Sequence, residues 1–279
     1  MTPLRKKMVD DMTVRGLADN TIKSYTQSVI GLSRHYGRSP EHISAPEVQN
    51  YLLFLHTERH LSWASCNCIR NGIRFLYRIT LGIPNTNFYV PSAKQPSRLP
   101  EILNQEELAK LFAATTNLKH RALLMTAYAA GLRCSELIHL RGTDIDSGRM
   151  LLRVNQGKGN KDRTVPLSPR LLKELRDYWR RTRPADILFP NRYGRHLSRK
   201  GPHYIYGAAK RKAGIKKSGG IHTLRHCYAT DLLEAGVALQ TIQRRLGHTS
   251  VRTTMTYLKL AQDRNGDIPS PLDQLAVAA

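Results

Sequence analysis

Residues 120–137 read HRALLMTAYAAGLRCSEL, an almost wholly apolar run that ends at a glycine and then becomes polar. A run that is apolar on every side predicts a helix buried at the centre of a domain, and Gly131 is the residue type that commonly ends a helix. Because Arg133 follows at once, we expect its guanidinium at the edge of the core, where it needs a partner. Glu136, three residues on, is a candidate for that partner, and on this segment alone the two side chains simply pair.

The segments around this run predict more helices and one small sheet. Asn104 and Glu107 fit a capping box that opens a helix before the central run. Downstream, residues 150–167, MLLRVNQGKGNKDRTVPL, have strand-like runs on both sides of GKGN, which predicts a β-hairpin with a basic tip. We expect helices again over 168–183, 199–213, 223–235, 239–246 and 250–261. The expected fold class is therefore mainly α with a small antiparallel β-sheet.

A proline-punctuated stretch divides the chain. Residues 91–100, PSAKQPSRLP, carry few core-forming side chains and are typical of an extended linker. Upstream, apolar residues at Ile22, Tyr25, Val29 and Leu32 predict a helix, which Asp19 or the next residue could cap. A second helix is expected from about residue 46 and a third over about 66–81. We therefore expect a helical domain over 1–90 and a second domain from 101.

The charge balance indicates a polyanionic partner. The chain has 44 Lys and Arg against 21 Asp and Glu, a formal net charge of +23. Both parts share the excess, with 12 basic against 6 acidic residues over 1–97 and 32 against 15 over 98–279. Such an excess favours nucleic acid as the partner, although a ribosomal or merely basic protein has the same composition. An anionic membrane surface is the weaker candidate, because no long basic amphipathic stretch lacks a core-facing explanation and no lipidation motif is visible. The longest uncharged apolar stretch, 122–132, is too short to cross a membrane.

Basic residues on the third expected helix form a row. Arg70, Arg74 and Arg78 lie on one face, and apolar residues including Ile69 and Ile73 lie on another. In a chain this basic we expect the row to contact DNA phosphates, the alternative being a solvated helix face. The N-terminal residues have no apolar core of a signal peptide, so we expect a cytoplasmic protein.

The four cysteines predict no metal site. Cys66, Cys68, Cys134 and Cys227 form no CxxC pair and no repeated zinc-ligand spacing. Free thiols are the expected state.

Five segments carry groups suited to phosphate chemistry: GLRCSEL at 131–137, GKGN at 157–160, HTLRH at 222–226, LGH at 246–248, and Tyr257. Within HTLRH, His222 and Arg225 are three residues apart and so project from one face of a helix. A guanidinium and an imidazole on one face can address the same phosphate group. Alone the spacing is weak, since HxxR also occurs by chance on helix surfaces.

Taken together, these segments resemble the tyrosine recombinase (phage integrase) family. The residues that carry the resemblance to the catalytic set are Arg133, Lys158, His222, Arg225, His248 and Tyr257, in that order. The resemblance covers essentially all of residues 101–260, and the helical N-terminal part resembles the family's SAM-like core-binding domain. It implies a two-domain DNA clamp with a DNA-binding domain at 1–90, a linker at 91–100, a catalytic domain at 101–261 and a C-terminal tail at 262–279. The compact size resembles the Xer and transposon-borne members.

The resemblance implies a division of labour among the residues around the phosphate. Tyr257 would be the nucleophile, and Arg133 and Arg225 would clamp the scissile phosphate and stabilise its transition state. Glu136 and His226 would support these groups from behind.

Proton transfer is implied to fall to the hairpin tip and the histidines. Lys158 would protonate the leaving 5′ oxygen, with Lys161 and Arg163 as rival candidates that otherwise contact DNA. His222 would take the tyrosine proton or bind the phosphate, and His248 would donate a further hydrogen bond to it.

The implied reaction needs no metal and no nucleotide cofactor. The implied partner is double-stranded DNA with specific recombination sites, bound by a homotetramer in the synaptic complex and by a monomer or weak oligomer before it; no membrane is involved. We expect residues 262–279 to dock on a neighbouring subunit, the alternative being a disordered tail. Two rival functions are a type IB topoisomerase and a non-catalytic DNA-binding relative.

Overall fold

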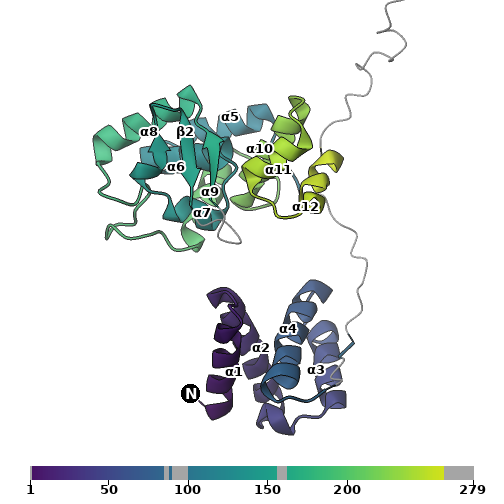
Figure 1. Ribbon diagram of the computed structural model, residues 1–279. Coiled ribbons are helices and arrows are strands. Elements are labelled where there is room, and N and C mark those ends of the chain that lie inside the picture. The colour runs from purple at the N-terminus through teal and green to yellow at the C-terminus, as the bar shows by residue number, and fades with distance from the viewer. Residues whose placement is uncertain (1, 85–87, 90–99, 156–161, 261–279) are drawn as a thin grey trace, which may run out of the picture. The chain divides into compact units, whose positions relative to one another are not determined.

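The computed structural model describes residues 2–84, 88–89, 100–155 and 162–260. The chain divides into two compact units, Met1–Ser97 and Arg98–Ala279 (Figure 1). Residues 91–99 of the expected linker and the whole expected tail, 262–279, lie outside the described residues.

The first unit is built from helices. They are α1 (Pro3–Val14), α2 (Asp19–Tyr36), α3 (Ala45–Thr57) and α4 (Trp63–Phe75), with a 3-10 turn (Pro40–His42) and a π-helical turn (Leu76–Thr80). Methionine, leucine and isoleucine side chains from these elements form one core, including Met8, Met12, Leu32, Leu52 and Ile73. Helices α2 and α4 pack closely because Gly72 has no side chain: a Cβ there would lie 2.9 Å from the Cα of Tyr25.

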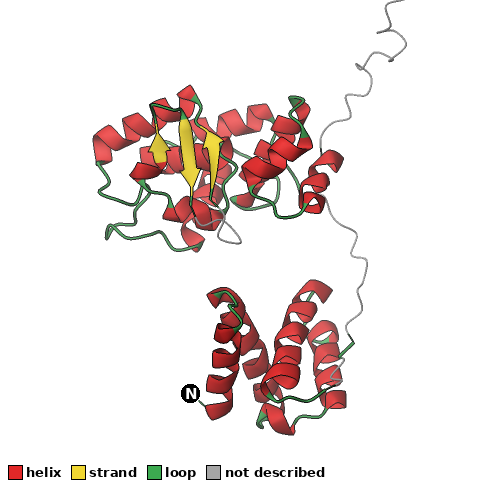
Figure 2. Cartoon of the chain, viewed as in Figure 1, coloured by secondary structure: helices red, strands yellow, loops and turns green. Residues whose placement is uncertain are grey.

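The second unit combines helices with a small sheet (Figure 2). Its helices are α5 (Gln105–Ala113), α6 (Leu118–Ala129), α7 (Cys134–His139), α8 (Pro169–Thr182), α9 (Lys200–Lys212), α10 (His222–Glu234), α11 (Leu239–Leu246) and α12 (Val251–Met255), with 3-10 turns at Gly142–Asp144 and Thr256–Lys259. The strands are β1 (Ile145–Asp146), β2 (Leu151–Val154) and β3 (Arg163–Pro166), antiparallel in the order β1-β2-β3. In register, Leu152 pairs with Ile145 on one side and Val165 on the other.

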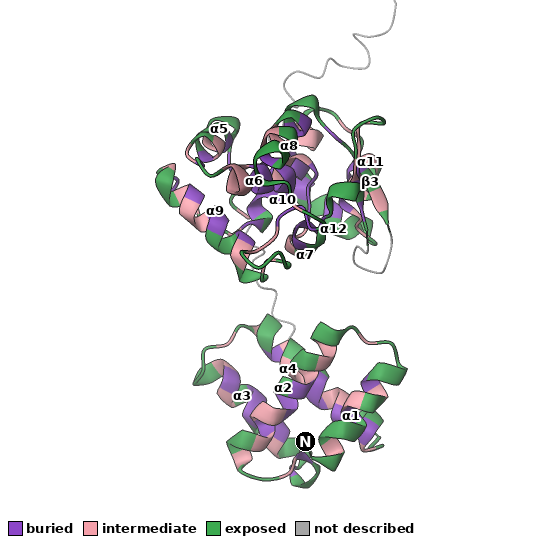
Figure 3. Ribbon diagram, turned by 90° about the vertical axis from the view of Figure 1, so that its left-hand side faces the viewer, coloured by how far each residue is buried: buried purple, intermediate pink, exposed green. Residues whose placement is uncertain are grey.

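Helix α6, which contains most of the apolar run before Gly131, is the centre of the second unit. It contacts α5, α7, α8, α9 and α10, and residues 122–127 are all buried (Figure 3). Gly131 has a φ of 55°, the left-handed conformation in which glycine costs least. A Cβ at Gly131 would lie 2.4 Å from a ring carbon of Tyr228, so the turn after α6 packs directly on α10.

The predicted fold class is confirmed: the unit is mainly helical with a small antiparallel sheet, and β2 and β3 form the predicted hairpin. The capping box of Asn104 and Glu107 is also present. Helices α1 and α7 and strand β1 were not predicted, because each is short or weakly patterned. One predicted helix cap is wrong. Asp19 lies inside α2 and does not cap it.

Within the part of the chain that the structure describes, no helix is both long enough and apolar enough to cross a membrane.

Candidate active site

Arg225 lies at the centre of the candidate site. It comes from the first turn of α10, and its side chain is 1% exposed. One terminal nitrogen donates to the carbonyl oxygen of Gly131 and the other to that of Leu246, both at 2.6 Å. Burial, followed by the charge of Arg133, lowers the pKa of Arg225 to about 10, so the guanidinium stays charged at neutral pH. The chain thus holds a buried cation on two backbone carbonyls.

Arg133 approaches the same point from α7. It is the N-cap residue of that helix, and its side chain is 20% exposed, as expected for a group at the edge of the core. Its Nη1 donates to Glu136 Oε1 at 2.7 Å, and its Nη2 donates to the carbonyl oxygen of Gly247 at 3.0 Å. The pair with Glu136 that the sequence predicted therefore exists. Arg133 also binds the carbonyl oxygen of Gly247, the residue after the Leu246 that Arg225 binds.

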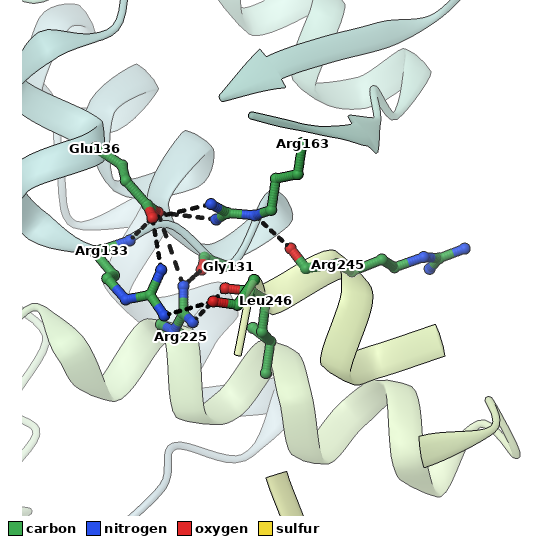
Figure 4. A network of polar contacts seen from close by, with 8 residues as sticks. Gly131, Arg133, Glu136, Arg163, Arg225, Arg245 and Leu246 are labelled. Atoms are coloured by element: carbon green, nitrogen blue, oxygen red, sulfur yellow. Dashed lines mark hydrogen bonds and ion pairs between the residues drawn. The ribbon is translucent and has the colours of Figure 1, made fainter. Parts of the chain in front are cut away.

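Glu136 is the carboxylate that all these arginines surround (Figure 4). Besides Arg133, it accepts two hydrogen bonds from Arg163, at 2.9 and 2.8 Å, and lies 3.8 Å from an Arg225 nitrogen. Burial would raise the pKa of Glu136, but the hydrogen bonds and charge of Arg163, and then of Arg133, lower it to about 2. The site therefore holds three guanidinium groups against one carboxylate, which leaves an excess of positive charge.

Tyr257 lies in the 3-10 turn after α12, not in the continuous helix over 250–261 that the sequence predicted. The residue is 3% exposed, and its hydroxyl lies 3.2 Å from Nδ1 of His226. The ring of His248 is parallel to the phenol within 8°, with centroids 6.3 Å apart. Burial raises the pKa of Tyr257, and the charge of Arg225 opposes that rise. The phenol is therefore neutral at pH 7 and needs a proton acceptor to become a nucleophile.

The three histidines near the phenol favour the neutral form. Desolvation, followed by neighbouring positive charge, lowers the pKa of His222 and of His248 to about 4. Part of the His222 side chain faces solvent; desolvation lowers its pKa first, followed by the charges of His226, Arg225 and Arg133. His226 shifts in the same direction through burial and Arg225. Neutral imidazoles can accept a proton or a hydrogen bond, which suits them to a tyrosine nucleophile.

His248 is oriented from its other side. Its Nδ1 lies 2.9 Å from the hydroxyl of Thr254, which is buried in α12. A contact of this kind fixes which ring nitrogen faces the site. Nothing in the sequence pattern singled out Thr254, because a threonine six residues from a histidine has no regular spacing on a helix.

The structure brings together most of the sequence-predicted set. The residues that lie close together are Arg133, His222, Arg225, His248 and Tyr257, with Glu136 and His226. Lys158 and Lys161 lie outside the described residues, so their expected roles stay predictions.

Arg163 has other partners than the sequence predicted, and the residues of the arginine row differ in exposure. Arg163 was expected on DNA or as a rival acid, but its side chain is 8% exposed and its guanidinium is occupied by Glu136 and a backbone carbonyl. The sequence pattern favoured an exposed Arg163, because its partner Glu136 lies far away in the sequence. In the first unit, Arg78 is exposed while Arg70 and Arg74 are half-buried, so the row does not present equal side chains.

The arrangement suits transfer of a phosphoryl group. Guanidinium groups stabilise charge on phosphate oxygens, and a phenol beside a neutral imidazole is an oxygen nucleophile with a base. Among the described residues, histidine, cysteine and carboxylate side chains form no cluster of three or more that could hold a metal ion.

Comparison with known proteins places this chemistry in a family. The model of the phage integrase family matches residues 101–264, and that of the phage integrase N-terminal SAM-like domain matches residues 4–86. The chain therefore belongs to the phage integrase family of tyrosine recombinases. The family predicted from the motifs is confirmed.

Individual relatives agree with this assignment. A putative integrase/recombinase of Sinorhizobium fredii, y4qK, is 41% identical over 99% of this chain and 90% of its own length. The tyrosine recombinase XerD of Oceanobacillus iheyensis is 32% identical over 91% of this chain and 92% of its own. Among solved structures, XerH bound to its palindromic difH substrate has a TM-score of 0.72 at 22% identity, covering 93% of this chain and 82% of that one. At that identity the likeness shows the fold.

Proposed function

We propose that this protein is a site-specific DNA recombinase that cleaves and rejoins DNA strands through a 3′-phosphotyrosine on Tyr257. The observation that carries the proposal is the position of that hydroxyl, 3.2 Å from His226 and in one cluster with the buried Arg225 and the partly exposed Arg133. Membership of the phage integrase family supports the reaction class.

In the cleavage step, Tyr257 Oη attacks the phosphorus of the scissile phosphate and the bond to the 5′ oxygen breaks. Negative charge grows on the non-bridging oxygens, where Arg133 and Arg225 stabilise it. Losing one such donor costs roughly 100- to 1000-fold in rate by analogy with oxyanion sites. Because the phosphotyrosine keeps the energy of the phosphodiester, a 5′ hydroxyl from another duplex reverses the step and joins the strands in a new combination.

Two protons move during cleavage. The phenol proton passes to a neutral histidine, and the leaving 5′ oxygen gains a proton from Lys158, as the family resemblance implies. His222 and His248 then serve as hydrogen-bond partners for the phosphate oxygens. Both rings lie close enough to Arg225 and Arg133, the arginines that bind the phosphate, to feel their charge. Rejoining reverses both transfers: the attacking 5′ hydroxyl returns a proton to Lys158, and the histidine returns a proton to the phenol oxygen of Tyr257.

DNA binding is assigned to both units. The helical unit matched by the SAM-like model supplies one arm of a clamp, with Arg78 as its most exposed member of the arginine row. The second unit supplies the other arm and the chemistry. Since most of the excess charge of +23 serves phosphate contact, affinity falls steeply with salt.

Covalent capture tests the proposal. The full chain is incubated with double-stranded fragments of the DNA that flanks its gene, the protein is denatured, and protein-bound DNA is recovered and sequenced. Wild-type protein is expected to yield adducts at a defined position, with a free 5′ hydroxyl at the cut. Tyr257→Phe is expected to yield none. Tyr204→Phe, which removes the hydroxyl of a residue on α9 that is 73% exposed, is expected to match wild type. Adducts from Tyr257→Phe would refute the assignment.

The mapped site then separates the rival functions. Placed twice in a supercoiled plasmid, it is expected to give resolved or inverted products. A topoisomerase changes the linking number and gives neither product, and a non-catalytic relative gives no adduct in the first experiment.

We also propose a homotetramer in the synaptic complex, because two duplexes with two cleavage positions each need four nucleophiles. Single-particle mass measurement on DNA carrying the mapped site is expected to show four protomers on two duplexes. Deleting residues 262–279 is expected to lower that population, since we place this tail on a neighbouring subunit. An unchanged population and unchanged strand exchange would refute the role of the tail.

A further inference from the structure

Arg163 is an enclosed arginine beside Arg133 and Arg225, the two arginines proposed to bind the phosphate. It is the first residue of β3, and three of its donors are satisfied: Nε by the carbonyl oxygen of Arg245 at 2.7 Å, and both terminal nitrogens by Glu136. Its aliphatic part packs on Gly247, where a Cβ would lie 3.2 Å from the arginine Cδ. A basic residue this enclosed is not placed to meet DNA.

The end of α11 shows why this enclosure matters. The last carbonyls of a helix have no partner within it and form the negative end of its dipole. Here the three consecutive carbonyls of Arg245, Leu246 and Gly247 accept from Arg163, Arg225 and Arg133 respectively. Each of the three guanidinium groups therefore lies close both to the Glu136 carboxylate and to the negative end of the α11 dipole (Figure 4).

The three arginines do not share Glu136 equally. Arg163 makes a bidentate contact with both carboxylate oxygens, Arg133 makes a single side-chain hydrogen bond, and Arg225 stands at 3.8 Å. Bidentate pairing is the strongest geometry available between these groups. The Glu136 carboxylate is thus neutralised chiefly by Arg163, which is not one of the two arginines proposed to bind the phosphate.

We propose that Arg163 is a positioning residue for the recombination reaction: it neutralises Glu136 and so leaves the charges of Arg133 and Arg225 available to the scissile phosphate. Without it, Glu136 draws on the two clamp arginines and offsets one of their two positive charges. In a water-poor site that loss acts directly on the phosphate charge of the transition state. This inference rests on the proposed function and assigns a role that the resemblance does not give to this residue.

Charge-balanced variants test the proposal. Arg163→Met leaves Glu136 to draw on Arg133 and Arg225 alone, and is expected to slow single-turnover cleavage at saturating protein by roughly 100-fold. The double variant Glu136→Gln with Arg163→Met removes both charges in a near-isosteric way and is expected to recover at least roughly 10-fold of that loss, because the clamp regains its net charge. A residue that only braces the fold gives no such rescue, since the double variant lacks even more of the hydrogen bonds.

Arg121→Met is the matched control. Arg121 makes a half-buried ion pair with Glu174 at 2.6 Å between α6 and α8, outside the site. It is expected to lower the melting temperature of the protein while cleavage stays within roughly threefold of wild type. Melting temperatures of all variants identify any that fail to fold. The double variant then decides, because it has no carboxylate left to draw on Arg133 and Arg225.

Three results would overturn the proposal: wild-type cleavage by Arg163→Met, a folded double variant no faster than the single one, or a lower salt dependence of DNA binding in Arg163→Met. The last would make Arg163 a phosphate contact. Wild-type protein is expected to form the Tyr257 adduct in all three cases, so none of these results contradicts the proposed function.

Discussion

His226 Nδ1 lies 3.2 Å from the hydroxyl oxygen of Tyr257, which puts this histidine in hydrogen-bond contact with the proposed nucleophile. The family pattern directed attention to His222, four residues earlier on the same helix. The rings of the two histidines are perpendicular, with centroids 5.1 Å apart. His226 is therefore placed to accept or orient the phenol proton, and His222 stands beside it towards solvent.

A pH profile tests this placement. Burial and Arg225 lower the pKa of His226 from its ordinary 6.5, so the ring is neutral at pH 7 and becomes protonated below 6.5. The second-order rate constant for adduct formation reports the free protein and is expected to be flat above pH 6.5 and to fall below it. In His226→Asn this acid limb is expected to shift to lower pH and the plateau to drop roughly 100-fold.

The control for this experiment is His203→Asn, an exposed histidine on α9. It is expected to keep both the plateau and the limb of wild type. An unchanged acid limb in His226→Asn would show that another group takes the proton.

Much of the site could be predicted from the sequence because it depends on local patterns. The apolar run before Gly131 marks a buried helix whatever surrounds it, and three-residue spacing puts His222 and Arg225 on one helix face. The order of the motifs then pointed to the family. These signals need no knowledge of how separate elements meet.

The rest depends on contacts between distant segments. Which histidine faces Tyr257 is decided by the rotation of α10 relative to the chain that returns after α12, and spacing within one helix carries no information on that. Arg163 looked exposed because its partner Glu136 is 27 residues away. The acceptors at the end of α11 are backbone carbonyls, which leave no trace in residue type.

Gly131 is expected to tolerate no side chain. Gly131→Ala imposes a left-handed φ on alanine and a Cβ 2.4 Å from the Tyr228 ring, so we expect a loss of roughly 2–4 kcal/mol in the free energy of unfolding. The matched variant is Gly214→Ala, where φ is also left-handed, at 70°, but no atom lies within 4 Å of the added Cβ. It is expected to lose only about 1–2 kcal/mol. Urea unfolding measures both, and equal losses would refute the role of the Tyr228 contact.

Arg78 is expected to contact a phosphate. It is the exposed member of the arginine row, so Arg78→Ala should weaken DNA binding on all sequences and reduce the slope of log affinity against log salt by about 0.9. Fluorescence anisotropy on labelled duplexes across a salt series measures the slope. Arg38→Ala is the control, because the Arg38 guanidinium is already paired with Glu47. A slope equal to that of wild type in Arg78→Ala would remove this residue from the interface.

The buried face of His248 predicts how the DNA-free protein responds to acid. Its pKa is lowered from 6.5 to about 4, chiefly by desolvation and then by Arg225, so the unfolded chain binds a proton between these two values and the folded chain does not. The stability linked to His248 is therefore complete above pH 6.5 and is lost as pH falls towards 4, by an amount on the order of 2 kcal/mol.

His248→Gln cannot titrate, so its free energy of unfolding should fall less than that of wild type between pH 7 and 4.5, whatever its value at pH 7. His42→Gln, at an exposed position in the first unit, should keep the wild-type pH dependence. Parallel curves for wild type and His248→Gln would mean that this imidazole is as well solvated in the folded protein as in the unfolded chain.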